Sequence, residues 1–449
     1  MTDEDRVVRN NEVSLLPPIR GREVQQARSS ALEALHNPSF CRYKDESVPL
    51  SRMETEASAA FLSWKKRVRH FTWAFFTLSM STGGIANALY NVPYKFRGLE
   101  TIGIIVFLFN IALYIITWAL LLLRFYLYPY TFKLSLTHPT ESLFVPASIV
   151  SFGTILINIS QYGPSATGPW LTYTVGVLFW IDVVLAVVFS AGIYLLLWST
   201  QTFTIAQMTP IWIFPAYPML IIGPHAGILS SKLDPSQALP IIIGGTTVQG
   251  VGFLVSLTVY SAYIYRLMSQ KLPKENVRPG MFVSVGPSAF TVSGLVTMAA
   301  NAERCFPDHF MGNGPLAASI LKVVTNFVCL WLWGLAIFFF LIATSAHWST
   351  IGPRRMEFSM AWFSFVFPNT ALITATFAIG KAFSCKPILV IGCVMTVALI
   401  LMYIFVFIMM IRAIVIRQIM WPQKGEDKDE GGFQINQIKP ESPGEQTPV

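Results

Sequence analysis

Polar side chains that could bind an anion stand beside prolines inside apolar segments of this chain. The clearest example is the run from Trp362 to Thr370, in which Pro368 is followed at once by Asn369. Proline frees a backbone carbonyl that lipid cannot satisfy, so such a break must face protein or water. Hydroxyl and amide groups there could hold an anion through hydrogen bonds and still release it. The candidate donors are Ser148, Ser288, Asn369 and Thr370, together with Ser81 and Thr82 of the first segment, which has Gly83 and Gly84 in place of a proline.

Ionisable residues are scarce in or beside the same segments, so each of them is informative. His138 and Glu141 stand at the start of the third apolar segment, where an acid also suits the N-terminal end of a helix dipole. His225 lies near the end of the fifth segment, where it could follow pH or cap the helix. Arg304 and Lys381 close the seventh and ninth segments and could concentrate anions at a pore mouth. We expect proton coupling or anion attraction from this group of residues.

The composition indicates an integral membrane protein. The chain has 449 residues, of which 53% are hydrophobic and only 12% charged, whereas soluble domains carry roughly 25% charged residues. The net charge of +8 is spread over loops beside apolar segments, so it indicates topology and lipid headgroup contact rather than nucleic-acid binding. No phosphate-binding loop and no Cys/His metal spacing is present in the sequence. We therefore expect no enzyme activity, no cofactor and no metal.

The apolar segments predict ten membrane-spanning helices in a domain of residues 71–412. They cover about residues 71–90, 100–123, 139–162, 170–197, 208–229, 239–267, 280–302, 319–345, 357–379 and 387–412. Residues 61–70, with Trp64 and several basic residues, predict an interfacial anchor. Residues 1–60 and 421–449 predict disordered tails. Because Lys and Arg concentrate on the side of the tails, both termini are expected in the cytosol.

The predicted spans alternate in character along the chain. Odd-numbered spans contain prolines, glycines and hydroxyl side chains, whereas even-numbered spans are mostly bulky and apolar. This alternation predicts an all-α fold of five tandem hairpins, with odd helices around a central pore and even helices outside. The alternative is that small residues merely let helices approach and that the hydroxyls bond to their own helix. Asp182 lies in an even-numbered span, and we expect it to bond another helix rather than touch a substrate.

Four stretches of the sequence resemble the tellurite-resistance/dicarboxylate transporter family. They are His70–Trp73, Ser81–Ile85 (STGGI), His138–Phe144 (HPTESLF) and Phe365–Ala371 (FVFPNTA). The likeness covers roughly residues 68–415 and is greatest to the fungal malic acid (C4-dicarboxylate) transporters. The family also contains sulfite efflux pumps and the slow-type anion channels of plants.

The resemblance implies ten helices as five hairpins around a pore, often in a homotrimer with one pore per protomer. It also implies a phenylalanine gate on the ninth helix, which corresponds here to Phe367, or to Phe365 if the register across Pro368 differs. Both rings could instead only pack.

The expected function is transport of malate, succinate or malonate across the plasma membrane, coupled to protons. The alternatives are sulfite efflux, a passive anion channel or, in a different class, a receptor or scaffold that signals through its tails.

Overall fold

The computed structural model describes residues 64–202, 204–348 and 356–421, which belong to one compact unit that begins at Trp64. Within these ranges every regular element is an α-helix or a 3-10 helix, so the all-α prediction is confirmed. The predicted tails lie outside the described residues, apart from Trp421. The predicted anchor is described from Trp64 on, where α3 (Trp64–Val68) carries Arg67, whose guanidinium donates to the carbonyl of Ile414 over 3.2 Å.

Two kinds of helix alternate along the chain, and we call them inner and outer helices. The inner helices are α4 (Phe76–Asn91), α7 (Ala147–Tyr162), α10 (Tyr217–Ser230), α12 (Gly286–Cys305) and α14 (Phe367–Ala382). The outer helices are α5 (Leu99–Leu127), α9 (Pro169–Thr200), α11 (Pro235–Gln270), α13 (Gly314–Ala346) and α15 (Lys386–Val415). Short helices α6 (Tyr130–Thr137) and α8 (Pro164–Thr167) lie in the connections.

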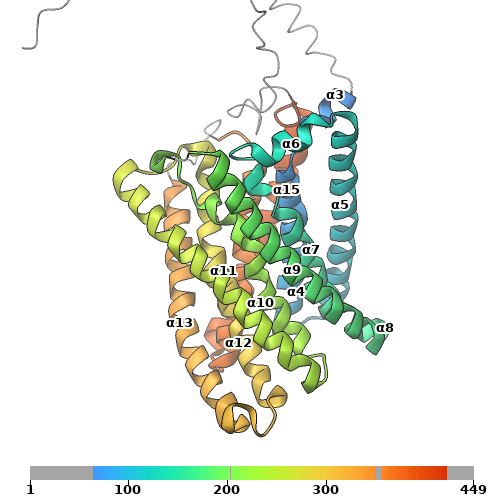
Figure 1. The fold of residues 1–449 in the computed structure, drawn as a ribbon, viewed down its shortest axis with the longest axis vertical. Helices are drawn as coiled ribbons and strands as arrows, with labels where there is room; N and C mark the ends of the chain where they lie inside the picture. The colour runs from blue at the N-terminus through green and yellow to red at the C-terminus, as the bar shows by residue number, and fades with distance from the viewer. Residues whose placement is uncertain (1–63, 203, 349–355, 422–449) are drawn as a thin grey trace, which may run out of the picture. The chain divides into compact units, whose positions relative to one another are not determined.

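The inner and outer helices differ in the share of their residues that is buried inside the protein. In the spans that contain α7, α10, α12 and α14, 89% of the apolar window is buried, whereas in the outer helices the buried share is only 22–33%. The exposed residues of the outer helices are themselves apolar, such as Ile105, Trp331 and Leu401. Apolar side chains that face outward in this way belong in lipid. The predicted arrangement of odd helices inside and even helices outside is confirmed (Figure 1).

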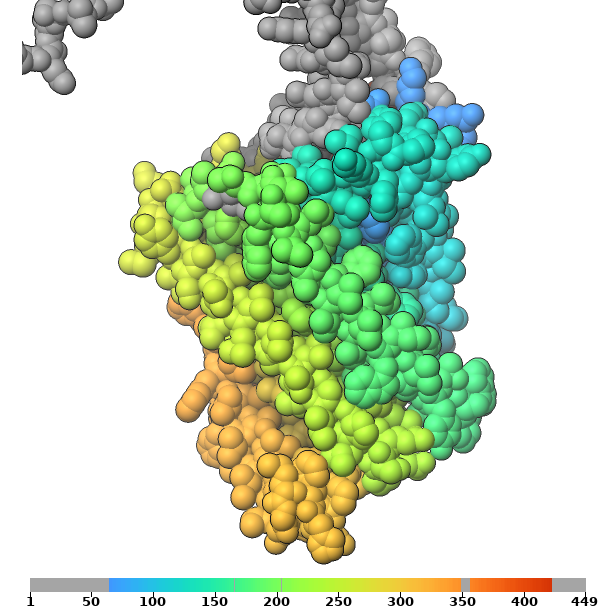
Figure 2. Space-filling view, in the orientation of Figure 1, coloured from blue at the N-terminus to red at the C-terminus, as the bar shows by residue number. Residues whose placement is uncertain are grey.

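Nine helices in the described part of the chain are long and apolar enough to cross a membrane. The expected first span, 71–90, corresponds to α4, which is not among these nine. The count of ten spans therefore stays a prediction. The face of the bundle seen in Figure 2 is covered largely by the green and yellow-green side chains of α9 and α11.

Every inner helix begins with a 3-10 segment. These segments are η1 (Trp73–Phe75), η2 (Ser142–Phe144), η4 (Pro210–Ala216), η5 (Glu275–Val285) and η8 (Met360–Phe365). Pro218, Pro287 and Pro368 are each the second residue of an inner helix, and Pro146 directly precedes α7. Proline fits the first turn of an α-helix because the N–H it lacks would have no partner there. The prolines therefore mark a change of helix type and do not bend a continuous helix.

The inner helices close into a ring. Along it α4 packs on α7, α7 on α10, α10 on α12, α12 on α14, and α14 returns to α4. The approach of α10 to α12 is especially close, because a Cβ atom added to Gly294 would lie 2.6 Å from the carbonyl carbon of Gly223. Gly84 plays a similar part between α4 and α14, where an added Cβ would lie 2.8 Å from the side chain of Thr370. Small residues thus let the ring close tightly.

Candidate functional site

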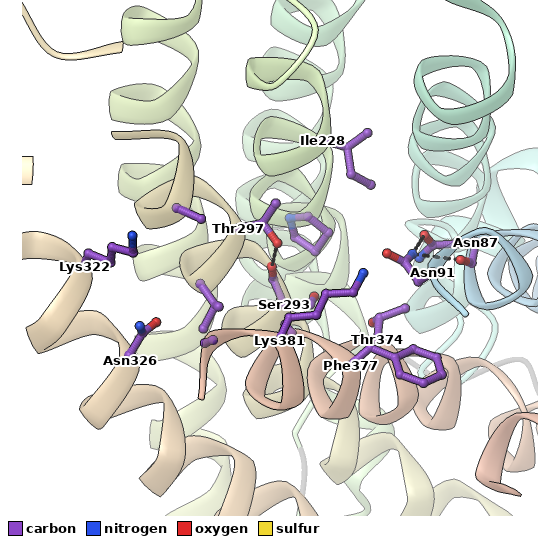
Figure 3. A pocket seen from close by; sticks show the side chains of 15 residues that line it. Asn87, Asn91, Ile228, Ser293, Thr297, Lys322, Asn326, Thr374, Phe377 and Lys381 are labelled. Atoms are coloured by element: carbon purple, nitrogen blue, oxygen red, sulfur yellow. Dashed lines mark hydrogen bonds between the residues drawn. The ribbon is translucent and has the colours of Figure 1, made fainter. Parts of the chain in front are cut away.

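A cavity of about 400 Å³ opens at the end of the ring where the inner helices finish, and we call it the vestibule (Figure 3). Its walls come from α4, α10, α12 and α14, with two residues from α13. Four of the five inner helices therefore surround one space, as expected of a pore. The polar residues in its walls are Asn87, Asn91, Ser293, Thr297, Lys322, Asn326, Thr374 and Lys381.

The neutral polar groups of the vestibule are held in place by hydrogen bonds. The amide nitrogen of Asn91 donates to the backbone carbonyl and the side-chain oxygen of Asn87, over 2.8 and 2.9 Å. The side chain of Gln161 donates to the same side-chain oxygen over 2.6 Å. The Thr297 hydroxyl donates to the carbonyl of Ser293 over 2.6 Å (Figure 3). The hydrogens of these groups are used within the protein, so an anion would accept one of them only after such a bond breaks.

Lys381 gives the vestibule a positive charge. It is exposed on the last turn of α14, and its ammonium has no ion pair or hydrogen bond within the described ranges. Figure 3 shows the side chain reaching across the cavity. Lys322, the second lysine of the wall, instead forms an exposed ion pair with Glu303 at 3.0 Å. An uncompensated ammonium beside neutral donors attracts anions and leaves cations unfavoured.

Above the vestibule, aromatic rings from four inner segments meet in what we call the aromatic constriction. It consists of Phe144, Phe214, Tyr217, Phe290 and Phe367, all buried. The Phe367 ring lies 5.3 Å from that of Phe290 and 6.1 Å from that of Tyr217. Since α12 separates α14 from α10 in the ring, a contact between Phe367 and Tyr217 reaches across the ring and not along its wall. Thr374 of the vestibule is two turns further along α14, about 10 Å away.

Phe365 points to a different neighbourhood. It is half-buried in η8 and packs on Phe282 and His347, with ring centroids 5.3 and 5.1 Å apart. His347 follows α13, so this group lies between an outer helix and the 3-10 segments. Burial lowers the pKa of His347, which its bond to the Ala343 carbonyl partly offsets and nearby Arg278 reinforces. These contacts agree with a register across Pro368 in which Phe367, and not Phe365, points toward the axis of the ring.

The six donors proposed from the sequence make bonds within the protein, and none of them lines the vestibule. Ser148, Asn369 and Thr370 donate to carbonyls of their own segment, those of Val145, Phe365 and Phe367. Thr82 bonds Leu78 and Tyr403, Ser81 donates to the carbonyl of Phe363, and Ser288 meets Tyr260 at 3.5 Å. Their role in substrate binding stays a prediction.

Lys381 was among the proposed residues and lines the vestibule, whereas the neutral polar residues of the wall were not proposed as binding groups. Ser293 and Thr297, and likewise Thr370 and Thr374, are four residues apart and repeat on one helix face. This spacing indicates a polar helix face, but the proposed donors were those beside the prolines, at the opposite ends of the same helices.

Glu141 and Arg304, both proposed for coupling or anion attraction, are engaged in structural contacts. Glu141 forms a two-pronged ion pair with the fully buried Arg124, with N–O distances of 2.5 and 3.3 Å. Arg124 also donates to the carbonyl of Phe71 over 2.8 Å, which ties α5 to the start of η1. The guanidinium of Arg304 donates to the carbonyls of Ser230 and Leu233 at the end of α10, a usual place for a cation.

The two histidines proposed from the sequence lie outside the vestibule. His138 accepts backbone N–H bonds from Thr140 and Glu141 and lines a second cavity, of about 460 Å³, near η2, η3 (Ile205–Gln207) and η4. His225 is completely buried between α10, α7 and α9. No group of three or more His, Cys, Asp or Glu side chains suited to a metal occurs in the described part of the chain.

Comparisons with known proteins agree with this architecture. Residues 70–411 match the family model described as "Voltage-dependent anion channel" (SLAC1). The malic acid transport protein of Schizosaccharomyces pombe is 31% identical over 376 residues, which cover 84% of this chain and 85% of the relative. A putative malic acid transport protein of the same organism is 30% identical, over 81% and 84%. A sulfite efflux pump of Arthroderma benhamiae is 26% identical, over 76% of this chain and 90% of the relative.

Proposed function

This chain belongs to the voltage-dependent anion channel (SLAC1) family, and we propose that it carries malate and related C4-dicarboxylates across the plasma membrane together with protons. It is a membrane anion transporter and not an enzyme. The proposal places both termini in the cytosol, so that the vestibule opens to the outside. The family resemblance adds a homotrimer to the proposal, with the apolar outer helices facing lipid and neighbouring protomers.

The observation that carries the proposal is the vestibule with its single uncompensated ammonium, Lys381. A dicarboxylate brings two negative charges and needs donors on both ends. One lysine supplies free donors to one end of the anion without a second fixed charge that would trap it, whereas Asn91, Thr297 and Thr374 would donate to the other end only after leaving their bonds within the protein. The volume of about 400 Å³ leaves room for a small organic anion and water. The names of the two relatives from Schizosaccharomyces pombe favour malate.

The aromatic constriction is the proposed gate. Phe367 closes the path against Tyr217 and Phe290, and substrate passes when these rings separate. In this proposal Phe365 supports the fold beside the gate, because its contacts are with Phe282 and His347.

The proposal is tested by uptake of labelled malate into vesicles that contain the purified protein, with and without an imposed pH gradient. We expect saturable uptake that increases when the side facing the vestibule is acidic. Lys381→Gln should weaken uptake at low substrate concentration. Lys322→Gln is the matched control, because Lys322 lies in the same wall but is already paired with Glu303. Equal uptake by the two variants would remove the support that the vestibule gives.

The same vesicles discriminate the alternatives. Sulfite flux without malate flux would identify a sulfite pump, the activity named for the relative from Arthroderma benhamiae. Large currents that follow voltage and ignore pH would identify a passive channel. Loss of all function after removal of residues 1–60 and 425–449, with the helical domain intact, would favour a receptor or scaffold.

A further inference from the structure

Asp182 lies in the middle of α9, on the helix face that turns toward the inner ring. Residues of this face recur at helical spacing and are buried: Thr172, Val175, Phe179, Asp182, Ala186, Ser190, Ile193 and Leu197. Asp182 is fully buried, and neither of its carboxyl oxygens has a hydrogen-bond partner within residues 64–202, 204–348 and 356–421. The bond to another helix that the sequence predicted is absent, so the prediction was wrong on this point.

The inner helices leave a space into which the Asp182 carboxyl fits. A Cβ atom added to Gly153 of α7 would lie 2.9 Å from Oδ2 of Asp182 and would also collide with Ile221 of α10. A glycine at this point of α7 is therefore needed for the carboxyl to reach the junction of α7, α9 and α10. The group stands directly behind the wall of the ring and outside the vestibule.

No positive charge faces Asp182 from the helices around it. On α5 the titratable neighbour is Tyr114, which interacts with Asp182 electrostatically. On α10 it is His225, whose ring lies 5.2 Å from Phe179, one turn before Asp182 on α9. On α7 no titratable side chain occurs before Tyr162, at the far end. An ionised carboxylate in these surroundings would cost several kcal/mol of desolvation without an ion pair in return.

His225 extends the same polar feature along the junction. Its Nε2 lies 3.4 Å from the hydroxyl of Ser160 on α7, and its Nδ1 has no partner in the described part of the chain. Ile221, which borders the same space beside Gly153 as the Asp182 carboxyl, is one turn from His225 and one turn from Tyr217 of the aromatic constriction. A movement of α10 that separates the constriction would therefore also change the surroundings of Asp182.

The occupant that suits this site is a proton. A calcium ion needs six or more oxygen ligands, and within the described residues no group of three or more His, Cys, Asp or Glu side chains could hold a metal here. A proton needs one acceptor and removes the charge that burial penalises. We propose that Asp182 is the carboxyl group that binds and releases the coupled proton. This inference rests on the proposed function, because it assigns the proton that is carried with the anion.

The first test uses vesicles at zero membrane potential with an imposed pH gradient of one unit. If one proton accompanies each anion, the wild type should accumulate malate roughly tenfold. Asp182→Asn keeps the shape of the neutral carboxyl and should still exchange internal for external malate, but should not accumulate it. Asp234→Asn, the matched control, removes an exposed carboxyl that bonds Tyr173 and should accumulate malate like the wild type. Gradient-driven accumulation by Asp182→Asn would overturn the proposal.

A second test needs neither substrate nor a variant. Aspartate labelled with ¹³C in the side-chain carboxyl shifts the infrared carbonyl band of a protonated aspartic acid in the wild-type protein. Asp182 is the single aspartate within the described helices, so a shifted band at neutral pH would be assigned to it. The proposal fails if no such band occurs. If malate is not carried at all, the proposed function fails, and the infrared band alone decides whether Asp182 holds a proton.

Discussion

Phe367→Ala should convert a closed pore into a leaking one. The Phe367 side chain is only 3% exposed, and its ring contacts reach α12 and, across the ring, α10. Alanine has no ring to make these contacts, whereas the rest of α14 keeps its helical bonds. The closed arrangement is therefore weakened more than the helix that carries the residue.

The size of the effect follows from the two ring contacts that are lost. Aromatic pairs contribute roughly 0.5–1.5 kcal/mol each beyond burial, so the closed state loses about 1–3 kcal/mol. A shift of that size changes a two-state equilibrium by about 5- to 150-fold. The free energy of unfolding should also fall, by at most about 3–5 kcal/mol, the usual loss when a buried Phe becomes Ala. The loss should be smaller than this where the cavity left by the ring adjoins the pore and fills with water.

The assay is efflux of labelled malate from loaded vesicles in the absence of a gradient, measured for the wild type, Phe367→Ala and Phe365→Ala. We expect rapid efflux for Phe367→Ala. Phe365→Ala should remain closed and show mainly a lower melting temperature, because Phe365 packs on Phe282 and His347. The opposite pattern would mean that the rings exchange roles. If neither variant leaks, the aromatic constriction is not the gate.

Three further outcomes follow from the contacts. Replacing Arg124 by methionine leaves a buried carboxylate without its ion pair, and this should destabilise the protein by about 3–5 kcal/mol; an unchanged thermal unfolding curve in detergent would contradict it. Gly294→Ala forces a methyl group against the backbone of α10 and should cost about 1–3 kcal/mol, whereas Gly250→Ala, with open space around it, should be neutral or slightly stabilising in the same assay. Lys381→Gln removes about 1 kcal/mol of attraction between the ammonium and an anion at ~4 Å in water, so the malate concentration that gives half-maximal uptake should rise roughly fivefold at low salt. This difference between variant and wild type should disappear at high salt, and a difference that salt does not change would exclude an electrostatic role.

The alternation of inner and outer helices could be predicted because the two kinds of helix differ in the types of residue they contain. Hydroxyls and small residues are concentrated where helices meet protein or water, and bulky apolar side chains such as Trp331 and Leu401 tolerate lipid. The prolines were also meaningful, but the sequence could not say that they begin an α-helix after a 3-10 segment. Whether a stretch is a 3-10 helix or an α-helix depends on the hydrogen bonds of several successive backbone groups, and proline constrains only its own φ angle and removes only its own N–H.

The roles of individual polar residues could not be predicted in the same way. A hydroxyl near a helix start has a carbonyl of its own helix within reach, and Ser148 and Thr370 both use it. Glu141 found its partner in Arg124, seventeen residues earlier on a different helix. Asp182 kept no partner at all in the described part of the chain, an outcome that the ordinary rule for buried polar groups does not anticipate.

A change of the 3-10 segments to α-helix would shift and rotate the inner helices that follow them. A residue in a 3-10 helix advances about 2.0 Å and turns about 120°, against about 1.5 Å and 100° in an α-helix. If the six residues of η8 changed to α-helical pitch, α14 would shift by about 3 Å along its axis and rotate by roughly a third of a turn. Phe367 is the first residue of α14, so the same change of pitch would swing its ring off the axis. We expect such rewinding of a short stretch of chain to open the proposed gate without displacing the long outer helices.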